Sequence, residues 1–411
     1  MNRALDYVCI FTGGSIRGAS YVGAIKAMEQ LGVNNKCFVG SSVGSIMAVF
    51  YAVGYSPEEL EEIFNEINFD LFKDINISFG KDFSISKGTF FLEWLKEKIE
   101  SKYYKENYVK GENPPVTFKD IDTDVVILTT DLYTSTVKVF SKETTPDYEI
   151  AMAVRISSSM PGLLKPVSYN GHLLIDGDLS RSWPIWKVVP SLLNYNTRIL
   201  EFRLEGSKER HNIANTSEYL NIVYTTFSNF AADHVISTYK DRDKFDYIRL
   251  DAKDVNITDF NLPNDKKQEL YNIGYRTTMD FFTQELPEKR KKLLPHYKKL
   301  FEQLEEIKQN IINSKYIIAK NQLNQLFVDI SKVKKVIDLE FYNNILDFYE
   351  SFTQNIFLAF GVISLIKNKR ELIKNITTIT NKIENKISEI EIFVGIKEEQ
   401  FTQQRTEVQH S

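Results

Sequence analysis

Glycine and proline are concentrated in residues 1–285 of this 411-residue chain, and that asymmetry divides it into two kinds of structure. Sixteen of the 18 glycines lie there, and no proline follows Pro295. Because both residues mark turns and interrupt helices, a region without them favours long helices. Residues 286–411 also carry 20 Lys and Arg against 16 Asp and Glu, a net of +4; since the whole chain is −4, residues 1–285 carry −8. We therefore place a domain boundary at Leu286-Pro287-Glu288.

The first region, residues 1–285, alternates strand and helix signals. Apolar spacing predicts strands at residues 7–11 and 36–40 and helices at 19–31 and 43–54. A further helix begins at Ser56-Pro57-Glu58-Glu59, which combines an N-cap serine, an early proline and a capping-box glutamate. Later strands are predicted at residues 124–130, 136–141, 172–176, 198–204 and 247–251. The alternation predicts an α/β fold with a largely parallel central sheet.

The second region, residues 286–411, has helical periodicity almost throughout. Two series follow the spacing of a heptad seam: Leu293, Tyr297, Leu300, Leu304, Ile307 and Ile311, and then Leu365, Leu372, Ile376, Ile379 and Ile383. Both are short, so we expect packed antiparallel helices, as a bundle or short coiled-coil hairpins. The apolar run 356–366 is well below the roughly 20 residues that span a bilayer. It fits a buried helix, an interfacial segment or an oligomer seam, and we favour burial.

Composition excludes several classes of protein. The chain is 43% hydrophobic and 26% charged, as in ordinary globular proteins, and its net charge of −4 gives no basic field for nucleic acid. Its two cysteines, Cys9 and Cys37, are too few for a disulfide scaffold or a Cys-based zinc site. The N-terminus lacks the charged segment and apolar stretch of a secretory signal. We expect a soluble intracellular protein.

The strongest local signal is Gly40-Ser41-Ser42-Val43-Gly44, a G-x-S-x-G pentapeptide between a predicted strand and a predicted helix. In this arrangement a sharp turn exposes the central serine hydroxyl, and flanking glycines avoid crowding the turn. The following helix N-terminus favours negative charge developing at the serine. Ser42 is therefore the candidate nucleophile, within an elbow made by Gly40 and Gly44.

A Ser-Asp-His triad on the common α/β-hydrolase fold is one alternative. In that fold several strands precede the nucleophile, whereas one clear strand precedes the strand of this elbow. His211 and His234 follow a potential acid in the required order, but neither lies in a distinctive motif. A surface or packing role suits both better.

Two further motifs carry potential chemistry. The glycine-rich turn Thr12–Gly18 follows the first strand, and such turns present backbone N–H groups to anions. It lacks the dinucleotide and Walker patterns, and it also fits a tight turn that binds nothing. Leu174-Ile175-Asp176-Gly177-Asp178 places an aspartate at a strand end. Burial would raise the pKa of Asp176 and suit it as a base, although such a residue is more often part of a turn.

These motifs, in this order, resemble those of the patatin-like phospholipase family. Its members carry a G-G-G-x-[KR]-G loop, a G-x-S-x-G elbow and a D-G-[GA] acid motif; residues 153–166, before the acid motif, also look familial. The resemblance covers roughly residues 6–285. It implies a three-layer α/β/α domain, 1–285, with a mostly parallel sheet, followed by an all-helical extension, 286–411.

The resemblance also implies the chemistry. Ser42 takes the place of the nucleophile, Asp176 that of the base in a dyad without histidine, and the acid motif continues through Gly177 and Asp178. The oxyanion loop falls on Gly13, Gly14, Ser15, Ile16, Arg17 and Gly18. The implied reaction is hydrolysis of acyl esters in phospholipids or related glycerolipids through an acyl-enzyme, with neither metal nor cofactor. An acyltransferase or a general esterase would use the same dyad.

Two residues depart from the family pattern. Ser15 stands where the third glycine belongs, and it is strained if the position needs a positive φ. Asp178 stands where a small residue belongs; it either pairs with Arg181 or caps a turn, or its charge raises the pKa of Asp176. These departures keep open a catalytically silent lipid-binding or scaffold protein as the rival interpretation.

A lipid hydrolase without a transmembrane segment must meet its substrate at a membrane surface. We expect a cytoplasmic protein peripherally associated with membranes, with no nucleic-acid partner and with the helical region open to a second copy or a protein partner. Trp183-Pro184-Ile185-Trp186 would form either an apolar rim or core. Basic residues of the helical region would favour anionic lipids or form a solvated face: Lys291, Lys292, Lys298, Lys299, Lys332, Lys334 and Lys335.

Overall fold

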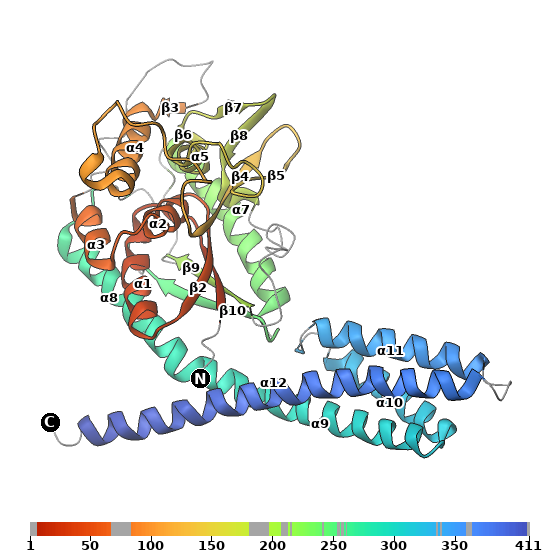
Figure 1. The fold of residues 1–411 in the computed structure, drawn as a ribbon. Helices are drawn as coiled ribbons and strands as arrows, with labels where there is room; N and C mark the ends of the chain where they lie inside the picture. Colours follow the sequence, from red (N-terminus) through yellow and green to blue (C-terminus); the bar gives the residue numbers. More distant parts are fainter. Residues whose placement is uncertain are drawn as a thin grey trace. The chain divides into compact units, whose positions relative to one another are not determined.

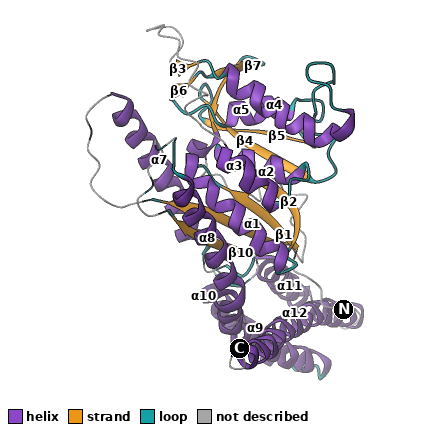
Figure 2. Cartoon of the chain, turned by 90° about the vertical axis from the view of Figure 1, so that its left-hand side faces the viewer, coloured by secondary structure: helices purple, strands orange, loops and turns teal. Residues whose placement is uncertain are grey.

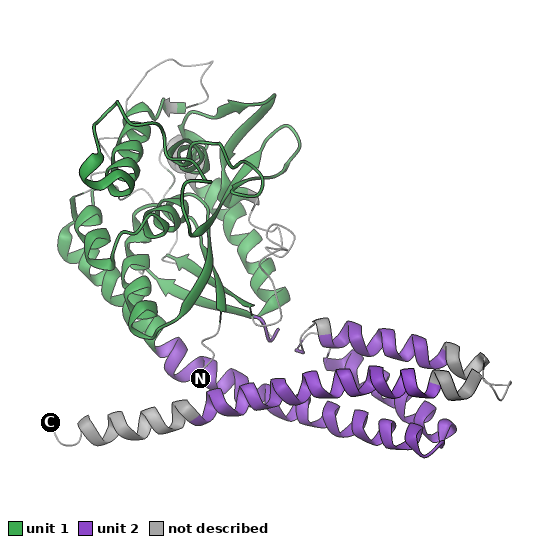
Figure 3. Cartoon of the chain, viewed as in Figure 1, with its two compact units in different colours: residues 1–240, 245–279 green, residues 241–244, 280–411 purple. Residues whose placement is uncertain are grey.

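The chain folds into two compact units, residues 1–240 with 245–279 (unit 1) and residues 241–244 with 280–411 (unit 2) (Figure 3). The computed structural model describes residues 6–66, 84–180, 197–206, 213, 216–240, 242–252, 255, 259, 261–333, 336–337, 339–358 and 364–408. The expected boundary at Leu286 lies within a continuous helical segment, because α8 (Asn264–Asp280), the π-helical turn η6 (Phe281–Glu285) and α9 (Leu286–Ile312) follow one another without a loop.

Unit 1 is an α/β structure (Figure 1). Its strands are β1 (Asp6–Phe11), β2 (Asn34–Gly40), β3 (Ser84–Ser86), β4 (Asp124–Asp131), β5 (Thr136–Ser141), β6 (Gly162–Leu164), β7 (Val167–Tyr169), β8 (His172–Asp176), β9 (Thr197–Glu205) and β10 (Phe245–Asp251). Its other helices are η1 (Ser15–Ala19), α1 (Ser20–Gln30), α2 (Val43–Ala52), α3 (Pro57–Glu66), α4 (Thr89–Tyr104), η3 (Lys105–Asn107), α5 (Ile150–Ser157), η4 (Gly177–Ser180) and α7 (Thr216–Tyr239).

The central sheet is mixed. Its order is β10-β9-β1-β2-β4-β8-β7, with β5 also paired to β4. Neighbours from β10 to β4 are parallel, as expected, whereas the β4–β5, β4–β8 and β7–β8 pairs are antiparallel. The parallel strands β1 and β2 therefore end side by side, and the next residues of each enter the glycine-rich turn and the serine turn.

Helices cover both faces of this sheet (Figure 2). Successive residues of a strand point to opposite faces. On one face Val8 of β1 lies in an apolar cluster with Val235 of α7. On the other face Phe11 of β1 lies against Tyr21 of α1, with ring centroids 5.0 Å apart. Unit 1 thus has the three-layer arrangement expected from the sequence.

Local sequence signals in unit 1 correspond closely to the structure. The strands predicted within residues 1–251 are all present, with shifts of one or two residues at their ends. The capping box that opens α3 is reciprocal: the Ser56 N–H donates to Glu59 Oε2 at 2.7 Å, and the Glu59 N–H donates to Ser56 Oγ at 3.2 Å. This match confirms that short-range hydrogen bonding starts the helix.

Unit 2 is helical and contains α9, α10 (Tyr316–Val333), α11 (Leu339–Leu358) and α12 (Ser364–Val408). The α9 and α12 helices pack antiparallel to each other (Figure 1). All six predicted seam residues of α9 are buried, as are Leu372, Ile376, Ile379 and Ile383 of α12. The side chain of Leu365, and much of the apolar run 356–366, lie outside the described residues.

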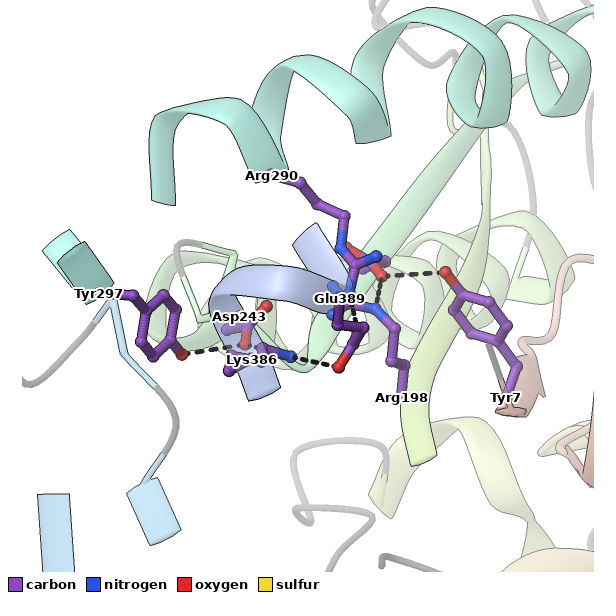
Figure 4. Close-up of polar contacts among 8 residues, drawn as sticks. Tyr7, Arg198, Asp243, Arg290, Tyr297, Lys386 and Glu389 are labelled. Carbon is purple, nitrogen blue, oxygen red and sulfur yellow. Dashed lines mark hydrogen bonds and ion pairs between the residues drawn. The ribbon is translucent and has the colours of Figure 1, made fainter. Parts of the chain in front are cut away.

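A buried polar cluster fastens residues 241–244 into unit 2. Figure 4 shows Tyr297 and Lys386 pointing toward Asp243. Asp243 accepts a hydrogen bond from the Tyr297 hydroxyl at 3.0 Å and forms an ion pair with Lys386 Nζ at 2.9 Å. All three residues are buried, and Glu389 extends the cluster to the fully buried Arg290. Figure 4 also labels Arg198 and Tyr7 of unit 1. Both donate to Asp246 of β10, at 2.8 and 3.5 Å.

In the part of the chain that the structure describes, no helix combines the length and the apolar character needed to cross a bilayer.

Candidate active site

The serine turn has the geometry of a nucleophile elbow. Ser42 lies between the end of β2 and the start of α2 with φ 51° and ψ −131°, a strained combination for a residue other than glycine. Its side chain is half-buried. A Cβ on Gly44 would lie 2.1 Å from the carbonyl oxygen of Phe11, and one on Gly40 would lie 2.4 Å from the Cα of Ser45. Only glycine fits at these two positions.

The end of α5 holds the elbow in place. The Ser42 N–H donates to both the carbonyl oxygen and the Oγ of Ser157, at 3.1 and 3.0 Å. The Ser157 hydroxyl in turn donates to the carbonyl oxygen of Leu128 on β4 at 2.7 Å. Two residues further on, the carbonyl of Ser159 accepts from the Asp176 N–H at 3.1 Å. Ser42 and Asp176 are therefore both hydrogen-bonded to the segment that ends α5, residues 157–159.

Asp176, the last residue of β8, is fully buried. Its Oδ1 accepts hydrogen bonds from the Asp178 N–H at 2.9 Å and from the Tyr224 hydroxyl at 2.8 Å. Its Oδ2 has no hydrogen-bond partner among the described residues. The Ser42 hydroxyl lies close enough to stabilise the charged carboxylate, although it makes no hydrogen bond of ordinary geometry to Oδ2.

The environment of Asp176 favours a carboxyl group that changes protonation near neutral pH. Burial, and after it the charge of Asp178, raise the pKa of Asp176 to about 7. The hydrogen bonds from the Asp178 N–H, Ser42 and Tyr224 act in the opposite direction, because they favour the charged form. A carboxyl group with this pKa can both accept and return a proton at physiological pH.

Asp178 joins four parts of the site. Its Oδ1 accepts from the Gly13 N–H at 2.8 Å and from the Ser41 hydroxyl at 2.6 Å, and its Oδ2 accepts from the Ser228 hydroxyl at 2.8 Å. It is buried, at 3% exposure. The departure from the family pattern thus ties together the glycine-rich turn, the elbow, the acid motif and α7. Arg181, the partner that one sequence interpretation offered, lies outside the described residues.

The glycine-rich turn is ordered around this carboxylate. The Gly13 N–H donates to Asp178, whereas no described group accepts the N–H of Gly14 or Ser15. Ser15 has a φ of 55°, so this serine adopts the left-handed conformation that glycine would favour. Arg17 is buried and donates from Nε to the Val255 carbonyl at 2.6 Å. Its role here is to anchor the turn.

The structure brings together the residues that the motifs singled out: Ser42, Asp176, Asp178 and the turn that begins at Gly13. Sequence reasoning missed Ser157, Tyr224 and Ser228. Ser157 lies in the familial stretch 153–166, which was a signal for it; the two α7 residues lie in no motif.

The histidines offer no third member of a triad among the described residues of unit 1. His172 pairs with Asp131, with 2.7 Å between Nδ1 and Oδ2, and His234 is exposed on α7. His211 and the Trp183–Trp186 run lie outside the described residues. Within the described ranges, no group of three or more His, Cys, Asp or Glu side chains is arranged to hold a metal ion.

Comparisons with known proteins agree with this architecture. The patatin-like phospholipase family profile matches residues 10–189. The chain is 30% identical over 279 residues to the "Uncharacterized protein R571" of Acanthamoeba polyphaga mimivirus, covering 65% of this chain and 90% of that protein. It is 25% identical over 178 residues to the "Probable lipid hydrolase 463L" of Invertebrate iridescent virus 6, covering 43% of this chain and 61% of that protein. The crystal structure of VipD from Legionella pneumophila superposes with a TM-score of 0.50 at 16% identity, covering 94% of this chain and 91% of VipD.

By its fold, the protein is a three-layer α/β protein of the patatin type with a helical C-terminal region. It belongs to the patatin-like phospholipase family, and it is accordingly a lipid acyl hydrolase.

Proposed function

We propose that the protein hydrolyses acyl esters of phospholipids or related glycerolipids through a Ser42–Asp176 dyad and an acyl-enzyme intermediate. The observation that carries this proposal is a strained, half-buried serine close to a fully buried aspartate whose Oδ2 has no hydrogen-bond partner among the described residues. The pKa of Asp176, raised to about 7, suits proton transfer at neutral pH. No histidine is needed.

In the first half-reaction, Asp176 Oδ2 takes the proton of the Ser42 hydroxyl while Ser42 Oγ attacks the ester carbonyl carbon. The tetrahedral intermediate carries its negative charge on the former carbonyl oxygen. When the carbon–oxygen bond of the ester breaks, the leaving alcohol takes the proton from Asp176 and the acyl group stays on Ser42. In the second half, water attacks the acyl-enzyme, Asp176 takes a proton from that water, and the proton returns to Ser42 Oγ as the fatty acid leaves.

The oxyanion donors in this mechanism are the backbone N–H groups of Gly14 and Ser15, because that of Gly13 is bound to Asp178. The start of α2 at Val43 adds the partial positive charge of a helix N-terminus beside Ser42. A single donor of this kind typically lowers the barrier by about 2.7–4 kcal/mol. Ser15 supplies an N–H as a glycine would, at a backbone cost of about 1–2 kcal/mol for its left-handed conformation.

Two observations favour the enzyme over the silent-scaffold interpretation. Ser15 adopts the positive φ that the turn requires, and Asp178 is integrated into the site by three accepted hydrogen bonds. Both residues thus sit in the site without disrupting it.

We place the substrate at a membrane surface because proteins of this family act on lipids. The basic residues of unit 2 contribute little to this, since Lys298 pairs with Glu391 at 2.6 Å and Lys299 pairs with Asp329 at 3.0 Å. Lys334 and Lys335 lie outside the described residues. These ion pairs favour a solvated face over a surface dedicated to anionic lipids.

The test is covalent labelling of the purified full-length protein with a fluorophosphonate probe, beside release of fatty acid from phosphatidylcholine vesicles. We expect labelling and fatty acid release by the wild type, loss of both in Ser42→Ala, and at least about a hundredfold loss of release in Asp176→Asn. Labelling that persists in Ser42→Ala would remove Ser42 as the nucleophile. Transfer of the acyl group to an added alcohol, without release of fatty acid, would identify an acyltransferase instead.

A further inference from the structure

Helix α7 presents one hydroxyl group to each of the two carboxylates in the site. The Tyr224 hydroxyl lies 2.8 Å from Asp176 Oδ1, and Ser228 Oγ lies 2.8 Å from Asp178 Oδ2. Tyr224 and Ser228 are four residues apart and therefore lie on the same face of the helix, one turn from each other. Neither belongs to a motif of the acid loop, the elbow or the glycine-rich turn.

These contacts determine which carboxylate oxygen is left for chemistry. Asp176 is fully buried, and its Oδ1 is occupied by two donors, the Tyr224 hydroxyl and the Asp178 N–H. Its Oδ2 is thereby the oxygen without a partner among the described residues. Two donors on one oxygen resist rotation of the carboxylate, since rotation would leave a buried phenol hydroxyl and a backbone N–H unsatisfied.

Ser228 acts in the same way on the second carboxylate. Asp178 binds the Gly13 N–H and the Ser41 hydroxyl through Oδ1, and Ser228 occupies its Oδ2. Both Ser228 and Asp178 are buried, at 6% and 3% exposure, so solvent does not replace the serine as donor. The orientation of Asp178 therefore depends on this hydroxyl.

The rest of α7 is held independently of these hydroxyls. Ala232, Val235 and Ile236 are buried, and Val235 lies in the apolar cluster on the sheet. Removing a hydroxyl from position 224 or 228 should therefore leave the helix in place, and the two hydrogen bonds are open to a selective test.

We propose that Tyr224 and Ser228 are positioning residues for the reaction: Tyr224 fixes Asp176 so that Oδ2 receives the Ser42 proton, and Ser228 fixes Asp178 as the clamp between the elbow and the glycine-rich turn. This inference rests on the proposed Ser42–Asp176 dyad. It assigns to α7, which lies outside every motif, a part in assembling the site.

The Tyr224 hydroxyl should change the pKa of Asp176 in a definite direction. The ionisable groups against Asp176 in the described structure are Asp178 of η4 and Tyr224 of α7, with the Ser42 hydroxyl of the elbow. The phenol donates to the charged form of Asp176 and so lowers its pKa. Tyr224→Phe removes that donor, and the pKa of Asp176 rises. The reaction needs the ionised carboxylate, so activity should appear at higher pH in the variant.

The decisive experiment is the pH dependence of kcat/KM for full-length Tyr224→Phe on a p-nitrophenyl ester. We expect the acid limb to move up by about one pH unit, with roughly tenfold lower activity below the limb and convergence toward the wild type above it. Tyr219→Phe is the matched control, because it removes a phenol hydroxyl from an exposed position of the same helix. An unchanged acid limb, or an equal loss at every pH, would overturn the role of Tyr224.

Ser228→Ala is compared with Ser237→Ala, whose hydroxyl donates to a backbone carbonyl on the exposed part of α7. We expect about a tenfold fall in kcat with KM unchanged in Ser228→Ala alone. Identical kinetics in the two variants would overturn the role of Ser228. Fluorophosphonate labelling distinguishes failure of this inference from failure of the proposed dyad. If the wild type is labelled at Ser42 but Tyr224→Phe and Ser228→Ala have the kinetics of their control variants, the inference fails and the dyad stands. Labelling at a residue other than Ser42 would refute the dyad itself.

Discussion

The second carboxylate of the site makes a quantitative prediction. Asp178→Asn removes the charge that acts on Asp176 while leaving an oxygen to accept from the Gly13 N–H and the Ser41 hydroxyl. The backbone N–H that donates to Asp176 is also retained. At the other oxygen, the amide nitrogen of the asparagine would donate to the Ser228 hydroxyl in place of accepting from it. The substitution therefore removes the charge and reverses one hydrogen bond.

The magnitude follows from the pKa of Asp176. A rise from the ordinary 3.8 to about 7 corresponds to about 4 kcal/mol between the two protonation states. Burial is the larger cause and persists in the variant, with the charge of Asp178 second. We therefore expect the pKa of Asp176 to fall by about one pH unit, or about 1.4 kcal/mol, in Asp178→Asn.

The assay is kcat/KM against pH on a p-nitrophenyl ester, at constant ionic strength. The acid limb should move to lower pH, so that the variant keeps more of its maximal activity below pH 7 than the wild type does. Asp147→Asn is the control, because Asp147 is an exposed residue of the same unit, paired with Lys119. An acid limb that stays in place or moves upward would refute the idea that the charge of Asp178 raises the pKa of Asp176.

Substitutions at three further positions, Gly44, Asp243 and Ser15, test other parts of the structure. Gly44→Ala forces a Cβ to 2.1 Å from a backbone oxygen of β1 and should lower kcat/KM at least about a hundredfold, so near-normal esterase activity would contradict the elbow geometry. Asp243→Ala removes the 2.9 Å ion pair of the buried Lys386 ammonium group and leaves it the longer contact to Glu389, at 3.7 Å. The change should cost about 3 kcal/mol in urea unfolding, against less than about 1 kcal/mol for the exposed Lys299→Ala; equal losses would show that the buried cluster is not stabilising. Ser15→Gly keeps the backbone N–H and should change the free energy of unfolding by less than about 1 kcal/mol, with activity retained. Ser15→Val places a β-branched side chain at a φ of 55° and should lower both the melting temperature and kcat/KM. A fully active Val variant would argue against that backbone conformation.

Local patterns predicted the local structure of the fold. The capping box at Ser56 and Glu59, the strand that leads to Ser42 and the seam of α9 each depend on residues within a few positions of one another, and each is found as expected. The antiparallel edge formed by β5, β7 and β8 was not foreseen, because strand direction depends on how connections return to the sheet. Short strands such as β6 also lack a recognisable alternation.

The site was predictable to the extent that its residues lie in motifs. Ser42 and Asp176 lie beside turns whose glycines are visible in the sequence, whereas Tyr224 lies 48 positions further along the chain than Asp176, its partner. Nothing in the local sequence of α7 indicates that contact. The hydrogen bond of the Gly13 N–H was not predictable for a similar reason. Its acceptor, Asp178, lies 165 residues away, and the two meet only once β1 and β8 are in the same sheet.

Because residues 241–244 belong to unit 2, no single truncation point divides the chain into its two units. A chain shortened to end at residue 285 would still contain Asp243 but would lack Tyr297 and Lys386, its buried partners. The Asp243 carboxylate, without these two partners, would lie in the connection between α7, which bears Tyr224, and β10. A loss of activity in such a truncated protein would thus report damage to that connection rather than a catalytic duty of the helical region. The contribution of unit 2 is better measured by point substitutions in the intact chain.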